Sequence, residues 1–279
     1  MTALSRLSLN QKTINNCTVP QVVELCTATG IGAVGLWREP VAEYGLQQTV
    51  DLVGEAGLRV SSLCRGGWFT ATGPAFDEAI ASNHAAIDEA AALGAACLCL
   101  VVGGLAEGSR DLAAAREQVA RAVEILVPHA AEAGVQLALE PMNPIYAADR
   151  GVLSTIEQAL QIAESYPGEQ VGVMVDTFHV WWDPALRAQL QRAGAEGRLA
   201  SYQICDWITP LPADTLLARG MMGDGHIDFA TIGQWVAEAG YTGDIEVEIF
   251  NADVWAADPR QVVDTMINRY GELCGPYAG

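Results

Sequence analysis

The chain alternates short apolar stretches with amphipathic ones from end to end, and this alternation constrains its fold more than any other feature. Strands are predicted at residues 7–10, 33–37, 59–64, 97–102, 135–140, 171–176, 200–205 and 244–250, and helices at residues 19–29, 41–56, 76–93, 110–133, 153–165, 184–193, 229–239 and 260–273. Eight such pairs of roughly 35 residues each are typical of a closed parallel (β/α)8 barrel, the TIM barrel. We therefore predict an α/β fold with a single TIM-barrel domain over residues 1–279, since no linker divides the sequence.

An open, doubly wound sheet is the main alternative for alternating strands and helices. Such a sheet needs fewer units and usually carries a glycine-rich phosphate loop after its first strand. Here the first strand ends in Asn10-Gln11-Lys12, and no G-x-G-x-x-G motif follows it. The sequence therefore favours the closed barrel.

The charge of the chain argues against several functions. The formal net charge is −19, and Lys12 is the only lysine. A surface for DNA or RNA needs clustered Lys and Arg side chains, so we expect no nucleic-acid partner. Schiff-base aldolase chemistry needs a lysine at the site, so it is also disfavoured.

The sequence shows neither a membrane span nor a signal peptide. Runs of 18 or more apolar residues are absent, and no basic stretch followed by an apolar segment opens the chain. The cysteines include no Cys-x-x-Cys pair, and Cys97 and Cys99 lie inside a predicted strand, so we interpret the cysteines as small core residues. We expect a cytoplasmic protein with no membrane partner. A homo-oligomer is compatible with the sequence.

The predicted strand at residues 171–176 reads Val-Gly-Val-Met-Val-Asp and alternates with the period of a strand. The valines share one face, so Asp176 points the same way as Gly172 and Met174, toward the barrel axis. His179 follows where the chain leaves the sheet. A carboxylate and an imidazole at the carboxyl end of a barrel strand are typical of catalytic residues. The alternative is that Asp176 caps a helix that begins near Asp183.

The same alternation places three more polar side chains on the barrel axis. They are Glu140, Gln203 and Glu248, each near the carboxyl end of its strand. Together with Asp176 they include three carboxylates, which need a compensating cation when they lie this close. An all-oxygen ligand set suits manganese (Mn²⁺) or magnesium (Mg²⁺) better than zinc. The alternative is that some of these residues lie deeper and pair with arginines. Glu246, one layer below Glu248, needs a buried partner that the sequence does not name.

Three motifs in this order resemble a known family, the sugar isomerase/epimerase group of xylose-isomerase-like TIM barrels. They are Leu139-Glu140-Pro141-Met142-Asn143, Asp176-Thr177-Phe178-His179, and Gly240-Tyr241-Thr242-Gly243 leading to Glu248-Ile249-Phe250. The group includes ketose 3-epimerases, hydroxypyruvate isomerases, inosose isomerases and dehydratases, and endonuclease IV. The resemblance covers nearly the whole chain.

The resemblance implies a ligand set for one divalent metal ion. In this group a Glu, an Asp, a His or Gln, and a final Glu hold the ion, and the matching positions here are Glu140, Asp176, Gln203 and Glu248. Gln at the third position is similar to the hydroxypyruvate isomerases, whereas ketose 3-epimerases have His.

The resemblance also implies substrate-binding residues. His179 of the D-x-x-H motif would contact substrate oxygens, and Arg219, ahead of Gly223-Asp224-Gly225, would lie near the reacting carbonyl. Tyr146 stands where ketose 3-epimerases have a second substrate-contacting Glu, which is a departure from those enzymes. Endonuclease IV chemistry would need more histidines than the 4 present.

The activity that this resemblance implies is metal-dependent isomerisation or epimerisation of a sugar. Either Glu140 or Glu248 would remove a proton next to a ketose carbonyl, and the resulting enediolate would be held by the metal and Arg219. Two alternatives stay open: a lyase or dehydratase acting on a keto-sugar or keto-polyol through the same site, and a non-catalytic sugar-binding barrel.

Four tryptophans follow predicted strand ends, where an indole ring can stack on a sugar: Trp37, Trp68, Trp181 and Trp182. We expect Trp37 and Trp181 to contact the substrate, with plain packing as the alternative for each. No Lys/Arg cluster or phosphate-binding turn is visible in the sequence. It therefore favours an unphosphorylated sugar or polyol ketone.

Overall fold

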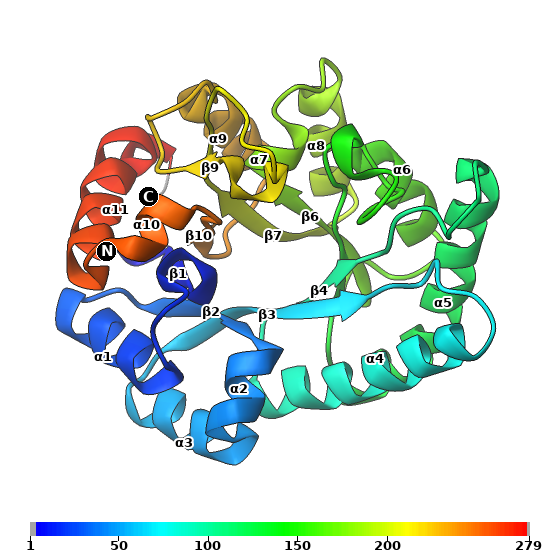
Figure 1. The fold of residues 1–279 in the computed structure, drawn as a ribbon, viewed down its shortest axis with the longest axis horizontal. Coiled ribbons are helices and arrows are strands. Elements are labelled where there is room, and N and C mark those ends of the chain that lie inside the picture. Colours follow the sequence, from blue (N-terminus) through cyan, green and yellow to red (C-terminus); the bar gives the residue numbers. More distant parts are fainter. Residues whose placement is uncertain (1–3, 278–279) are drawn as a thin grey trace.

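The structure, a computed structural model, describes residues 4–277. Eight parallel strands form a closed barrel (Figure 1). In their order around the barrel they are β1 (Leu7–Asn10), β10 (Ile245–Val247), β7 (Leu199–Ile204), β6 (Val171–Asp176), β5 (Leu137–Leu139), β4 (Leu98–Val101), β3 (Arg59–Gly67) and β2 (Ala33–Trp37). The predicted TIM barrel is confirmed.

Helices surround the barrel on its outside (Figure 1). The long ones are α1 (Val19–Thr29), α3 (Leu46–Glu55), α4 (Pro74–Leu93), α5 (Leu112–Ala133), α6 (Ile156–Ala163), α8 (Leu186–Ala195), α9 (Phe229–Glu238) and α11 (Pro259–Leu273). Among the described residues, no helix combines the length and the apolar character needed to cross a membrane.

Short elements lie mostly at the carboxyl ends of the strands, and the sequence pattern did not predict them. They are α2 (Arg38–Tyr44), α7 (Thr177–Val180), α10 (Ala252–Ala256), the two-stranded β8 (Asp206–Trp207) and β9 (Arg219–Gly220), and the 3-10 turns η1 (Gln11–Ile14), η2 (Pro144–Tyr146), η3 (Thr215–Ala218) and η4 (Gly275–Tyr277). Such elements are too short to show a helical or strand period.

The helix predicted at residues 41–56 is wrong in one respect, because the structure has two helices there. They meet at Gly45, whose φ of 110° lies in the region that favours glycine. The strands predicted at residues 135–140 and 244–250 are shorter in the structure, and Glu140 and Glu248 lie just past the ends of β5 and β10.

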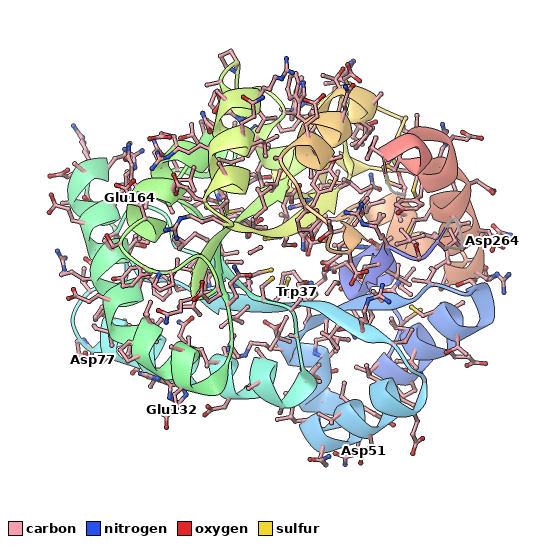
Figure 2. All side chains as sticks on the ribbon, turned by 180° about the vertical axis from the view of Figure 1, so that it is seen from behind. Trp37, Asp51, Asp77, Glu132, Glu164 and Asp264 are labelled. Carbon is pink, nitrogen blue, oxygen red and sulfur yellow. The ribbon has the colours of Figure 1, made fainter. Side chains whose placement is uncertain are left out.

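Two apolar clusters divide the core as the alternation predicts. The larger lies between strands and helices and includes Val171, Val173 and Val175. The smaller one contains the alternate residues of the same and neighbouring strands: Trp37, Cys64, Cys97, Cys99, Ala138, Met174 and Phe250. In Figure 2, Trp37 lies near the middle of the molecule, whereas Asp51, Asp77, Glu132, Glu164 and Asp264 lie at its periphery. The axis-facing residues therefore form a separate inner layer beneath a cavity.

Candidate active site

Four predicted site residues meet at the carboxyl ends of four neighbouring strands. Asp176 and Gln203 are direct neighbours in the β6–β7 ladder. Glu140 follows β5, and Glu248 follows β10 with its backbone N–H donating to Ile204 O. All four residues are buried. A cavity of about 240 Å³ opens onto three of them, Glu140, Gln203 and Glu248, and also onto Arg219.

Arg219 lies directly among the carboxylates. Its Nη1 is 2.7 Å from Asp176 Oδ2 and 3.1 Å from Glu248 Oε2. The guanidinium carbon lies 5.0 Å from the ring centroid of Phe178 and 5.2 Å from that of Phe250. Burial acts to lower the pKa of this guanidinium, but the carboxylates of Asp176 and Glu248 outweigh it and hold the pKa well above its ordinary value. The arginine is therefore a permanent positive charge inside the site.

This contact shows that the alternative to a metal site, pairing of carboxylates with an arginine, does occur for Asp176 and Glu248. It leaves two buried oxygens, Gln203 Oε1 and Glu248 Oε1, without a hydrogen-bond donor among the described residues. Unpaired buried acceptors are costly unless a cation or donor meets them. The pKa of Glu248 is raised to about 8, mainly by burial and with a contribution from the neighbouring Asp176 and Glu140, while Arg219 acts against the rise. The oxygen donors at this cavity are of the kind that a hard divalent cation prefers.

His179 lies closer to the carboxylates than its loop position suggested. Its Nε2 is 3.4 Å from Glu140 Oε1 and 3.8 Å from Asp176 Oδ2, and the three residues are grouped tightly enough to hold a metal ion. Its Nδ1 accepts the backbone N–H of Asn143 at 3.2 Å. Its Nε2 also lies 3.1 Å from Arg219 Nη2, which can only donate, so this nitrogen faces both a guanidinium and the Glu140 carboxylate.

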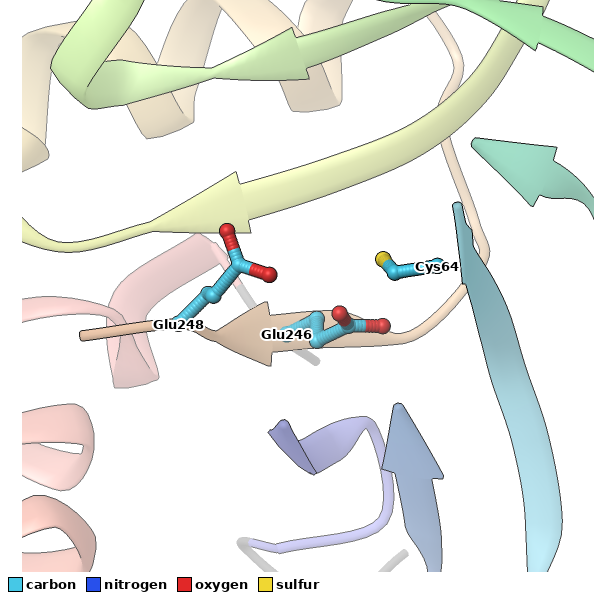
Figure 3. A group of neighbouring side chains, drawn as sticks. All are labelled: Cys64, Glu246 and Glu248. Atoms are coloured by element: carbon cyan, nitrogen blue, oxygen red, sulfur yellow. The ribbon is translucent and has the colours of Figure 1, made fainter. Parts of the chain in front are cut away.

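Glu246 has the buried partners that the sequence did not reveal. Its carboxylate accepts hydrogen bonds from Asn10, Ser61, Ser62 and Gln203. Figure 3 shows Glu246 and Glu248 projecting from consecutive layers of the same segment, with Cys64 pointing toward them. Burial raises the pKa of Glu246, and these donors act against that rise. Since its oxygens are already saturated by donors, Glu246 is poorly suited to hold a metal ion with Cys64 and Glu248.

The bond between Gln203 and Glu246 orients the amide. Gln203 Nε2 donates to Glu246 Oε1 at 2.7 Å, so the amide oxygen is the atom left free. Asn10, Ser61 and Ser62 were missed by sequence analysis. The strand alternation carried a signal for Asn10, which shares a strand face with Ser8, and for Ser62, which shares one with Cys64.

The tryptophans divide into two groups. Trp37 and Trp68 line the cavity. Trp181 is not among the residues that line it, and its ring packs against Trp207 with centroids 5.8 Å apart. Trp182 donates its indole N–H to His179 O. The predicted contact of Trp181 with a substrate therefore has no support from its position, whereas that of Trp37 does.

Tyr146 is buried next to His179. The two rings meet edge to face with centroids 5.6 Å apart. Tyr146 thus holds the imidazole in place by packing, with an aromatic ring where the ketose 3-epimerases carry a carboxylate.

Comparison with known proteins agrees with the fold. The family model of the xylose isomerase-like TIM barrel matches residues 22–269, and the chain belongs to this family. A ketose 3-epimerase of Arthrobacter globiformis is 25% identical over 199 residues, which cover 67% of this chain and 61% of the epimerase. The chain therefore spans less than two thirds of the length of that relative.

Two solved structures are similar over nearly the whole chain. A protein of Sinorhizobium meliloti 1021 is 44% identical, with a TM-score of 0.94 and coverage of 97% of this chain and 99% of that one. The IolI protein, whose structure has a binding zinc atom, is 19% identical, with a TM-score of 0.81 and coverage of 98% and 99%. Both solved structures therefore share the barrel fold of this chain.

Proposed function

We propose that this protein is a divalent-metal-dependent isomerase or epimerase that moves a proton next to the carbonyl of a ketose-type substrate. The observation that carries the proposal is the pair of buried, unpaired oxygens, Gln203 Oε1 and Glu248 Oε1, beside Glu140 at one cavity. Carboxylates held in a buried site serve as proton-transfer groups when a cation and an arginine balance their charge.

Glu140, Asp176, Gln203 and Glu248 would hold the ion, with Mn²⁺ or Mg²⁺ preferred by their oxygen donors. A bound divalent ion would polarise the substrate carbonyl and stabilise negative charge on its oxygen. Both ring nitrogens of His179 already lie within hydrogen-bond distance of a donor, the Asn143 N–H and Arg219 Nη2, which supports a role outside the ligand set.

Glu140 and Glu248 are the proposed proton-transfer residues. In the barrel, β5 and β10 are separated by β6 and β7, so the two carboxylates approach the cavity from different sides. One carboxylate removes the proton from the carbon next to the carbonyl, and the electron pair of that C–H bond forms an enediolate. Return of a proton by the other carboxylate on the opposite face inverts the carbon, whereas return to the neighbouring carbon by one residue isomerises the sugar.

Arg219, which lines the cavity, supplies the fixed positive charge that the enediolate oxygens need. His179 is fully buried and is not among the lining residues, although its Nε2 lies 3.1 Å from Arg219 Nη2, so its contact with substrate oxygens stays a prediction from the sequence. Trp37 offers its indole face as a wall for the sugar. We propose no contact for Trp181, which remains a prediction from the sequence alone.

Turnover in deuterium oxide tests this function. Proton transfer predicts solvent deuterium at the carbon next to the carbonyl, and Glu140→Gln and Glu248→Gln should each lose about 10²–10⁴-fold in rate. An epimerase with two bases has a further signature, since one single variant still exchanges the proton from its remaining face without inverting the centre. Product without solvent deuterium would indicate a hydride shift and refute the proposal. Loss of a β-substituent would indicate a lyase.

A further inference from the structure

Two basic side chains line the same cavity as the carboxylates and share one aromatic partner. Lys12, in η1, places Nζ 4.8 Å from the ring centroid of Trp37. Arg65, in β3, places its guanidinium carbon 5.8 Å from the same centroid and 4.9 Å from that of Trp68. All four residues line the cavity. Trp37 is buried and donates its indole N–H to Asn10 Oδ1, so it is a fixed platform under both cations.

Neither cation forms an ion pair with a carboxylate within residues 4–277. The one polar contact of Lys12 Nζ is to the neutral Asn15 Oδ1 at 3.0 Å. Elsewhere the chain pairs its arginines readily: Arg219 meets two carboxylates and Arg192 meets three. With 34 acidic and 15 basic residues, unpaired cations gathered at one cavity are unexpected.

The remaining charges at the cavity do not cancel this pair. Arg150 also lines it, and among the described residues its one carboxylate partner is the exposed Asp149, at 3.6 Å. Glu39 is the one acidic lining residue outside the candidate metal site, and its side chain is exposed to solvent. Burial of like charges near each other is unfavourable unless an anion joins them.

We propose that Lys12 and Arg65 form a subsite for an anionic group, a carboxylate or a phosphate, carried by the substrate. The inference rests on the proposed function, because it assumes that the carbonyl end of the same molecule lies at Glu140 and Glu248. Charge-assisted hydrogen bonds from a guanidinium and an ammonium are the means by which proteins hold such anions. The sequence itself favoured an unphosphorylated sugar or polyol ketone, because it shows no Lys/Arg cluster.

The subsite also explains how an acidic protein would bind an acidic ligand. Acidic side chains such as Asp51, Glu132 and Asp264 lie at the periphery in Figure 2. At physiological ionic strength, exposed charges are screened beyond about 8 Å, so the potential inside the cavity depends on its own lining. The substrate is thus a small keto-sugar with a charged end, recognised locally.

Binding of three ligands that differ only at carbon 6 tests the subsite. D-fructose, D-fructose 6-phosphate and D-fructuronate are titrated calorimetrically into the full chain with Mn²⁺. We expect at least one charged ligand to bind about 10–100-fold tighter than D-fructose, and the better of the two identifies the anion.

Variants show whether these two residues cause the preference. Lys12→Met and Arg65→Met should each reduce the ratio of charged to neutral affinity by about 10-fold, and Arg65→Lys should retain most of it. Arg121→Met, at an exposed position of α5, is the matched control and should leave the ratio unchanged. Equal binding of all three ligands, or a preference that persists in both Met variants, would overturn the subsite.

The test of the subsite and the test of the proposed function can fail independently of each other. If ketoses exchange deuterium with solvent but show no charge preference, the subsite is wrong and the proton-transfer function stands. If the charged ligand binds through Lys12 and Arg65 but no ketose exchanges deuterium, the subsite stands and the proposed reaction is wrong.

Discussion

Removal of the Arg219 charge should destabilise the metal-free protein by a predictable amount. Arg219→Met keeps much of the side-chain volume between Phe178 and Phe250 but leaves Asp176 and Glu248 without their cation. Breaking a buried ion pair by deleting one partner costs about 3–5 kcal/mol. The pKa of Glu248 is raised to about 8, so without metal this carboxyl group already binds a proton at neutral pH and depends less on the guanidinium. We therefore expect the free energy of unfolding to fall by about 3 kcal/mol, the lower end of this range.

Thermal unfolding in the presence of a chelator measures this loss. For a chain of 279 residues, about 2 °C per kcal/mol predicts a fall in Tm of about 6 °C. Adding Mn²⁺ at about 100 times its dissociation constant should raise the free energy of unfolding of the variant by about 2.7 kcal/mol, which nearly equals the loss caused by the substitution. Arg187→Met is the matched control, because its pair with Glu238 is exposed and should cost less than about 1 kcal/mol.

A metal-free Arg219→Met variant as stable as the unmodified protein would refute this reasoning. It would mean that the carboxylates take up protons at no cost, so that Arg219 does not balance their charge.

Three further predictions concern the metal and the residues around it. The purified protein should carry about one divalent ion per chain by elemental analysis and lose activity on chelation; absence of the ion with unchanged activity would contradict the ligand set. His179→Ala should lower activity while the metal content stays near one, and loss of metal in proportion to activity would make His179 a ligand. Glu246→Ala should weaken Mn²⁺ binding about 10–100-fold in a calorimetric titration, because it frees the Gln203 amide to rotate; the loss should disappear when Gln203→Ala is already present, and an equal loss in that background would refute the orienting role.

The fold was predictable because its signal is local. Alternation within each strand distinguishes the axis from the helix side without knowledge of any partner strand, so Asp176, Gln203 and the inner layer with Met174 were placed correctly. The break at Gly45 and the short helix α7 were not predicted, because both depend on one or two residues and leave no period.

The convergence of Glu140, Asp176, Gln203 and Glu248 also followed from the sequence, since parallel strands in a closed barrel bring their carboxyl ends together. The sequence alone therefore determined the barrel, its inner face and a carboxylate-rich candidate site. Only the tertiary structure decided which cation lies among those carboxylates, that Asn10, Ser61 and Ser62 meet Glu246, and that Lys12 and Arg65 share one indole. These are contacts between strands and loops distant in the chain, and their geometry depends on how the barrel closes and on the side-chain conformations that packing selects.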